Sequence, residues 1–442
     1  MATSKKKKSR KTSEKKIEAV SKSRIIIDAK INESSNYKEV KKVFVDYFIS
    51  GCSQQNFLGL ELEHFVVQKH GSNVIPFFGD CGVQDILYKL QNLYSDSVFS
   101  NEYLIGLSRQ NIDLTLEPGA QFETSIGKFL SVSKIASEYS KFSREIKPIL
   151  DSFGLMLLNC GYHPHAKVAD IPLLPKVRYH FMDEHFQNLG DLGKCMMRGT
   201  AATHVTFDYK DQTDFATKYR VSNFLTPIFA FLFDNSPIFE STKATGMTRA
   251  HVWLNTDRQR SCFVPNSFDR DFSFESYADY VLQRCPLFVY DSQNTLQKTD
   301  KTVSQIFSEK LPTNEDIAHI LSTFFPFTRL KHYLEFRVAD SMPINFALGY
   351  VALIKALMYN SDNLQTLYNL FDNCNQTDAE LAFEVLLKDG FAAIVYNKNI
   401  TIFLQELWQM AQTALKNDED NIYLNYLSPL FDVTKKRPIY LF

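Results

Sequence analysis

The sequence predicts an α+β fold: one sheet with helices on its apolar face, and a polar face left open. Two observations lead to this prediction. Short segments alternate apolar with charged residues, as in Leu60-Glu61-Leu62-Glu63, where both carboxylates project from the same side of a strand. Segments with apolar residues at helical spacing separate these strands. A row of charged side chains is therefore expected on one face of the sheet.

Each expected element follows from a local pattern. Apolar residues at helical spacing predict helices at 37–49, 83–93, 131–153, 214–234, 274–282, 314–324 and from 344 toward the C-terminus. Gly154 is the expected stop of the third helix. Alternation predicts strands from residue 25, at 61–67, as a hairpin over 111–124, within 196–209, and at 251–254 and 330–338. The proline-rich stretch 161–175 is expected to be an extended loop.

Composition indicates an ordered globular protein with a basic tail. The chain has 442 residues, of which 45% are hydrophobic and 22% charged. The net charge is −1, but residues 1–24 contain ten Lys or Arg and only two Glu, so the remainder is mildly acidic. We expect a disordered tail at 1–24 and a single domain at 25–442, whose part from about 344 to 442 is mostly helical.

The tail has a simple interpretation and several alternatives. With almost no apolar residues, it cannot offset the entropy of ordering, and a solvated extension is the favoured interpretation. Binding to nucleic acid or to an anionic membrane, or use as a nuclear signal, are the alternatives. No apolar stretch follows the charges, which excludes a secretory signal, and Lys in place of Arg disfavours a transit peptide.

The remaining sequence predicts a cytoplasmic protein that does not cross a membrane. The apolar run 224–233 is too short to span a bilayer and contains Thr226 and Pro227. The cysteines are odd in number and form no Cys-x-x-Cys pair, which favours buried thiols in a reducing compartment and leaves a regulatory disulfide open. There are seven of them: Cys52, Cys81, Cys160, Cys195, Cys262, Cys285 and Cys374.

Several common catalytic motifs are absent from the sequence. It contains no Gly-x4-Gly-Lys-Ser/Thr loop, no Gly-x-Gly-x-x-Gly after a strand, no His-Glu-x-x-His and no paired-cysteine zinc pattern. No Ser or Cys lies in a Gly-x-Ser-x-Gly turn. Walker-type nucleotide binding, dinucleotide binding and zinc hydrolysis are thus disfavoured, and the acidic strands remain as the candidate chemistry.

Each charged segment alone has an ordinary interpretation. Glu61 and Glu63 fit the solvated face of an edge strand, and a histidine on a strand, such as His204, is more often structural than a ligand. Glu335 and Arg337 fit a weak surface ion pair. Taken together, these segments favour a site, because clustered carboxylates repel one another unless cations lie between them, and Mg²⁺ prefers carboxylate and phosphate oxygens. Arginines offer bidentate partners for a carboxylate or a phosphoryl group.

Four segments resemble the plant and proteobacterial type of glutamate–cysteine ligase. They are Glu61-Leu-Glu63, Leu116-Glu-Pro-Gly-Ala-Gln-Phe-Glu123, Thr248-Arg-Ala-His-Val-Trp253 and Tyr333-Leu-Glu-Phe-Arg-Val-Ala-Asp340. The resemblance covers roughly residues 57–357, and between the four segments it includes 170–179 and 230–237. It implies a glutamine-synthetase-like fold: a curved, mainly antiparallel sheet whose concave polar face binds metal–ATP and glutamate.

The resemblance also implies roles for individual residues. Arg249 is expected to hold glutamate and Arg337 to lie near the phosphates, both as catalytic residues, with Trp253 on the same strand face as Arg249. Lys176 and Arg178 are weaker candidates for polyphosphate or product contact. Residues matching the family's metal ligands, for Mg²⁺, are Glu61, Glu63, Glu117, Glu123, His204 and Glu335.

Three positions depart from the family pattern. Val338 follows Arg337 where glycine is usual and is expected to crowd the backbone, and Ala120 replaces the second glycine of a Pro-Gly-Gly turn. Arg198 lies one position early. None of the departures removes a carboxylate.

The expected activity is ATP- and Mg²⁺-dependent ligation of the glutamate γ-carboxylate to the amino group of cysteine through an acyl phosphate, the first step of glutathione biosynthesis. One alternative is a ligase of the same fold with another amine acceptor. The other is a non-catalytic family member whose basic tail binds nucleic acid. The expected partners are ATP, glutamate and cysteine or another amine, and the chain is expected to be a monomer or a homodimer.

Overall fold

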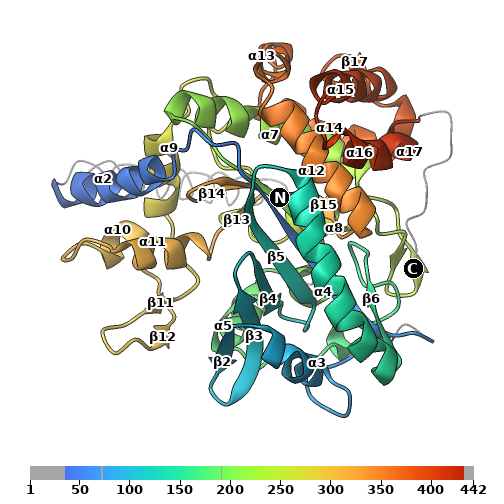
Figure 1. Ribbon diagram of the computed structural model, residues 1–442. Coiled ribbons are helices and arrows are strands. Elements are labelled where there is room, and N and C mark those ends of the chain that lie inside the picture. The colour runs from blue at the N-terminus through green and yellow to red at the C-terminus, as the bar shows by residue number, and fades with distance from the viewer. Residues whose placement is uncertain (1–34, 71–72, 191, 433–442) are drawn as a thin grey trace, which may run out of the picture.

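The computed structural model describes residues 35–70, 73–190 and 192–432, and a nine-stranded sheet forms its centre (Figure 1). The strands lie in the order β14-β15-β7-β1-β5-β4-β3-β2, with β6 pairing with the far end of β1, and every pair is antiparallel. The predicted tail and the strand from residue 25 lie outside the described residues. The strands are β1 (Leu58–Gln68), β2 (Asp96–Ser100), β3 (Tyr103–Arg109), β4 (Ile112–Leu116), β5 (Phe122–Phe129), β6 (Leu155–Leu158), β7 (Ala202–Phe207), β14 (Thr328–Leu330) and β15 (Leu334–Asp340).

The two faces of the sheet differ as the alternation predicts. On β1, Leu58, Leu60 and Leu62 are buried in the hydrophobic core, so Glu61 and Glu63 project from the opposite face. The pairing of β15 with β7 shifts its register at a β-bulge between Phe336 and Ala339, and β1 has a similar irregularity near its start. Bulges bend strands and increase their twist, which curves the sheet.

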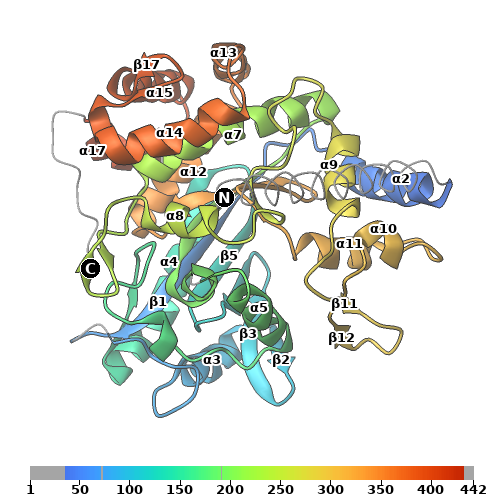
Figure 2. The same cartoon turned by 180° about the vertical axis from the view of Figure 1, so that it is seen from behind.

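Helices cover the apolar face. Helix α4 packs on β5, α7 on β15, and α12 on β1 and β7 (Figures 1 and 2). The predicted α+β fold is therefore confirmed. The longer helices are α2 (Ser35–Ser50), α3 (Val83–Leu90), α4 (Val132–Phe153), α5 (Val177–Gln187), α7 (Gln212–Leu232), α9 (Phe274–Leu282), α11 (Asn314–Leu321), α12 (Ile344–Met358), α13 (Ser361–Leu370), α14 (Gln376–Asp389) and α15 (Ile400–Ala414).

Shorter elements complete the fold, and one expected stop is confirmed. Gly154 ends α4 in the left-handed conformation, with φ +69°. No helix in the described part of the chain is long and apolar enough to cross a membrane. The short elements include α6 (Leu192–Lys194), α8 (Thr248–Leu254), α10 (Val303–Ile306), α16 (Asn421–Leu424), α17 (Ser428–Phe431), β10 (Ser261–Cys262) and β13 (Phe325–Pro326).

The strand predicted at 251–254 is wrong, because this segment lies in helix α8. Arg249 and Trp253 therefore do not share the face of a strand. Their spacing of four residues places them on the same side of a helix instead. The helix follows Met247, which has a left-handed backbone (φ +49°) and so turns the chain sharply before the helix begins.

Candidate active site

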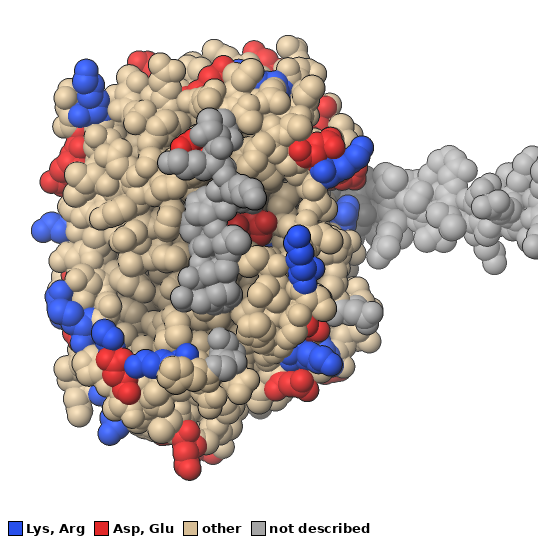
Figure 3. Space-filling model, turned by 90° about the vertical axis from the view of Figure 1, so that its right-hand side faces the viewer, with Lys and Arg blue, Asp and Glu red and all other residues tan. Residues whose placement is uncertain are grey.

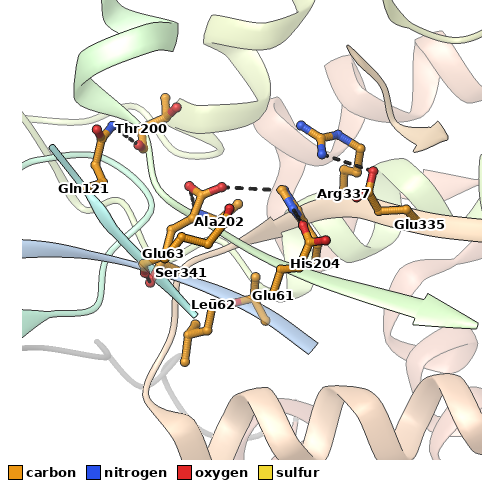
Figure 4. Close-up of polar contacts among 12 residues, drawn as sticks. Glu61, Leu62, Glu63, Gln121, Thr200, Ala202, His204, Glu335, Arg337 and Ser341 are labelled. Carbon is orange, nitrogen blue, oxygen red and sulfur yellow. Dashed lines mark hydrogen bonds and ion pairs between the residues drawn. The ribbon is translucent and has the colours of Figure 1, made fainter. Parts of the chain in front are cut away.

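Strand pairing brings the predicted acids together. Glu61 on β1 lies opposite His204 on β7, and Glu63 lies opposite Glu123 on β5. Figure 4 shows the imidazole of His204 between the carboxylates of Glu61 and Glu63. Since the register of an antiparallel pair decides which side chains meet, acids that are distant in the sequence become neighbours on the polar face.

These side chains surround a cavity of about 240 Å³. One part of its lining is acidic and another is basic, so the cavity suits cations together with a polyanionic ligand. The predicted residues that line it are Glu61, Glu63, Glu117, Glu123, Lys176, Arg178, His204 and Arg337, together with the unpredicted Thr115, Arg329 and Lys331.

Glu335 is placed differently from the other acids, because it is fully buried and surrounded by cations. Arg329 binds its carboxylate with two contacts, Lys331 approaches to 3.1 Å and Arg337 to 3.2 Å. Burial acts to raise the pKa of Glu335, but these cations hold it well below the usual range. Ligand atoms of Glu61, His204 and Glu335 nevertheless lie within 4.8 Å of one another.

Two acids of the cavity, Glu63 and Glu123, resist ionisation. Burial and the Glu117 carboxylate raise the pKa of Glu63 to about 8. Burial and the neighbouring carboxylates of Glu61 and Glu117 raise the pKa of Glu123 well above its usual range, although the Thr115 hydroxyl donates to it at 2.5 Å. Burial and the neighbouring carboxylates both disfavour the charged forms of these two acids. A bound cation would offset these effects.

His204 is suited to bind a metal ion. Burial and Arg337 lower the pKa of His204 to about 4, so the ring is neutral at physiological pH. Its Nδ1 lies 3.0 Å from a carboxylate oxygen of Glu61, which accepts, so we infer that Nδ1 carries the proton. Nε2 therefore presents a lone pair 4.0 Å from Glu63, and within the described residues it has no hydrogen-bond partner. A buried lone pair beside carboxylates fits a metal ligand.

Arg249 and Trp253 project from α8 into a smaller adjoining cavity of about 60 Å³, which also contacts Glu63, Glu117 and Arg337. The guanidinium of Arg249 donates to the carbonyls of Val338 and Arg337, each at 3.0 Å. The Nε of Arg249 and the Nε1 of Trp253 find no acceptor in the part of the chain that the structure describes. Arg249 thus supports the β15 backbone and keeps one donor free.

The structure shows where the three positions that depart from the family pattern lie. Val338 is buried in the core, and its carbonyl accepts from Arg249. Ala120 has a left-handed backbone with φ +60°, a conformation that favours glycine. Arg198 pairs with Asp183 and donates to the Ile171 carbonyl at 3.1 Å, so it fastens a loop to α5 instead of lining the cavity.

Lys176 and Arg178 lie at the start of α5 and line the main cavity. The Lys176 ammonium lies 5.0 Å from the ring centre of Tyr179, and burial and Arg178 lower the pKa of Lys176. Arg178 donates to the carbonyl of Ser322 at 3.3 Å. Both are placed to contact an anion in the cavity.

Arg329 and Lys331 are site residues that sequence reasoning missed. They alternate with Leu330 and precede the strand that carries Glu335 by a tight turn, a pattern that predicts a hairpin. That hairpin places Arg329 directly opposite Glu335. Recognising the pairing from the sequence would have added two cations to the predicted site.

A third cavity, of about 430 Å³, lies beyond Glu61 on the same strand. Lys128, Asp208 and Tyr333 are among its lining residues. Glu61 contacts this cavity and the main one, while Glu63 contacts the main one and the small one beside α8. The 240 Å³ cavity is therefore bordered by one cavity at Glu61 and by another at Glu63.

Comparison with known proteins identifies relatives over most of the chain. The family model of glutamate–cysteine ligase family 2 matches residues 57–390. Glutamate–cysteine ligase B from rice, a chloroplastic protein, is 28% identical over 386 residues, which cover 85% of this chain and 77% of the relative. The chloroplastic glutamate–cysteine ligase of Arabidopsis thaliana is 30% identical over 347 residues, 76% of this chain and 66% of the relative.

A solved structure supports the fold. The crystal structure of a glutamate–cysteine ligase from Francisella tularensis in complex with AMP aligns with a TM-score of 0.52 and 14% identity. The alignment covers 88% of this chain and 84% of the other. At this identity, the similarity concerns the arrangement of helices and strands.

Proposed function

The chain belongs to glutamate–cysteine ligase family 2, and from this premise we propose that it joins the γ-carboxylate of glutamate to the amino group of cysteine at the expense of ATP. This reaction is the first step of glutathione biosynthesis, and the enzyme is a glutamate–cysteine ligase. The observation that carries the proposal is the cavity in which four glutamates and His204 face five basic side chains.

We propose that Mg²⁺ is the metal, since carboxylate oxygens together with phosphate suit it. The residues that would hold it are Glu61, Glu63, Glu117, Glu123, His204 and Glu335. The raised pKa of Glu63 and the free Nε2 lone pair of His204 support this set. When bound, the metal would neutralise charge on phosphate oxygens. Glu335 is the least accessible member, because Arg329 already occupies its carboxylate.

The basic residues would bind and orient the triphosphate. Arg337 and Lys331 line the cavity beside Glu335, and Lys176 and Arg178 approach from α5. A γ-carboxylate oxygen of glutamate would attack the γ-phosphorus of ATP, and the bond to ADP would break to leave an acyl phosphate. The free amine of cysteine would then displace phosphate and lose a proton. Neither step needs a nucleophilic side chain, so positioning and charge neutralisation supply the catalysis.

The two cavities that border the 240 Å³ cavity, one at Glu61 and one at Glu63, indicate where the substrates lie. We propose that glutamate occupies the small cavity, where Arg249 and Trp253 offer free N–H donors. The larger cavity beyond Glu61, with Lys128 and Tyr333, would receive the nucleoside of ATP. The reacting γ-phosphoryl and γ-carboxyl groups would then meet over the acids.

A substrate panel tests the reaction. Purified protein is incubated with ATP, Mg²⁺ and glutamate plus cysteine, other amino acids or polyamines, and the amide product is identified by mass spectrometry alongside ADP release. We expect γ-glutamylcysteine as the main product. A different dominant amide would favour the alternative acceptor, and no amide with any amine would reject the ligase proposal.

One face of the described part of the chain lacks the charge pattern of a nucleic-acid surface. On the described residues of the face shown in Figure 3, Lys and Arg are interspersed with Asp and Glu, a pattern unlike the single-sign stripe of a nucleic-acid surface.

Each of the seven cysteines is a free thiol. We therefore propose a reducing compartment, and the cytoplasm remains the expected one.

A further inference from the structure

A cavity of about 350 Å³ lies on the other side of α8 from the acids. It shares no lining residue with the three cavities along β1. In Figure 2, α8 lies between the C-terminal helices and the elements around α5. The floor of the cavity is apolar and buried, formed by Met247, Ala250, Cys262, Phe263 and Phe383.

The rim of this cavity carries charges of both signs that remain available. Glu380 and Glu384 lie one turn apart on α14 and are exposed, as is Arg258 after α8. Arg258 donates to the Leu254 carbonyl at 3.2 Å, and Glu380 accepts from Gln376 at 2.9 Å. Among the ion pairs of the described residues, none involves Arg258, Glu380 or Glu384. An apolar floor with unpaired acids and an arginine above it fits a small zwitterion with an apolar side chain.

Helix α8 connects this cavity to the acidic site, by which we mean the 240 Å³ cavity lined by the glutamates and His204 together with the small cavity beside it. Arg249 and Trp253 lie on one side of this helix, while Ala250 lines the cavity on the other. The Cys262 thiol donates to the Trp253 carbonyl at 3.5 Å. Met247 and Cys262 both have left-handed backbones, with φ +49° and +69°, and strained positions of this kind cluster at ligand sites and switches.

A second connection runs through a short parallel pair. Cys262 in β10 lies opposite Pro326 in β13, and the adjacent Phe325 lines both the main cavity and the small one. The rings of Phe325 and Trp253 are 6.0 Å apart. A ligand that moves Cys262 would therefore also move Trp253 and Phe325, which line the small cavity beside the acids.

We propose that this cavity binds an α-amino acid with an apolar side chain, and that binding changes the affinity of the acidic site for glutamate. The side chain would lie on the floor, the ammonium group beside Glu380 and Glu384, and the carboxylate beside Arg258. The effect on glutamate rests on the proposed function, whereas binding to the cavity does not.

The two tryptophans of the chain provide a direct test. Trp408 stacks on Phe431 in the C-terminal helices, so a Trp408→Phe variant leaves Trp253 on α8 as the only tryptophan. L-leucine, L-methionine and L-phenylalanine are titrated in turn while Trp253 fluorescence is recorded without ATP. We expect at least one of them to give a saturable change, and to change the KM for glutamate about fivefold or more.

Rim variants separate this cavity from the substrate site. Glu384→Lys and Arg258→Glu should each abolish the fluorescence change and keep basal activity, while Lys388→Glu, an exposed change on the same helix, should retain both. A response that persists in the rim variants, or that L-glutamate abolishes competitively, would overturn the proposal, as would no saturable response to any of the three. Binding without a change in KM would overturn the coupling. Failure of the ligase proposal would appear differently, as absent turnover with the fluorescence response intact.

Discussion

Arg329 and Glu335 form a buried bidentate pair between β14 and β15, with Nε 2.5 Å from Oε2 and Nη2 2.9 Å from Oε1. The two residues are directly opposite in the strand register. Lys331 and Arg337 contact the same carboxylate. Glu335 therefore organises three cations of the site as well as offering a ligand atom.

Glu335→Gln should destabilise the protein, because it leaves the buried Arg329 guanidinium without its counterion. Loss of one partner of a buried pair costs about 3–5 kcal/mol. Urea unfolding measures this change. Glu61→Gln is the matched variant: Glu61 lines the cavity and is repelled by Glu335, so a loss below about 1 kcal/mol is expected. Similar losses in both variants would show that the ion pair carries no special weight.

Stability without metal should fall as the pH rises. The pKa of Glu63 is raised from its usual 4.5 to about 8, so the folded state binds a proton that the unfolded state has already released between those values. The unfolded state binds fewer protons there, hence stability decreases from about pH 4.5 to about 8. Metal binding competes with that proton.

Thermal unfolding checks this dependence. Mg²⁺ should raise the melting temperature more at about pH 8.5 than at about pH 6, because at lower pH it must displace the Glu63 proton. Glu63→Gln should reduce the dependence. A Mg²⁺ effect that is equal at both pH values, or larger at pH 6, would contradict the assignment.

Steady-state kinetics can separate the two cavities that border the 240 Å³ cavity. Trp253→Ala should raise the KM for glutamate about tenfold, equivalent to about 1.4 kcal/mol, and leave the KM for ATP nearly unchanged. Lys128→Ala, in the larger cavity, should do the reverse. Both variants affecting the same substrate would reject the proposed arrangement of the substrates.

The acidic strands were predictable because the two-residue period of a strand decides the side of each residue. Glu61 and Glu63 project from one face of the strand and Leu60 and Leu62 from the other, wherever the strand is placed in the sheet. The meeting of Glu63 with Glu123, however, depends on strand register, and the resemblance to a known family indicated only that both acids belong to one metal site.

Helix α8 was mispredicted because its alternation is short. Arg249-Ala-His251-Val-Trp253 fits a strand over five residues, but its apolar and charged positions also fit two turns of a helix. The pairing of Arg329 with Glu335 was missed because 330–338 was predicted as one strand, whereas residues 331–333 separate β14 from β15. It depends on a tight turn between two strands, and local propensity does not mark which side chains then face each other.

Mn²⁺ binding followed by electron paramagnetic resonance tests most directly whether the acids and His204 share a divalent cation. The free Mn²⁺ signal should decrease saturably on addition of wild-type protein, and His204→Ala should weaken binding about tenfold or more. His70→Gln, which changes an exposed histidine after β1, should bind as wild type does. A wild-type titration that matches buffer, or His204→Ala binding with wild-type affinity, would contradict a shared cation.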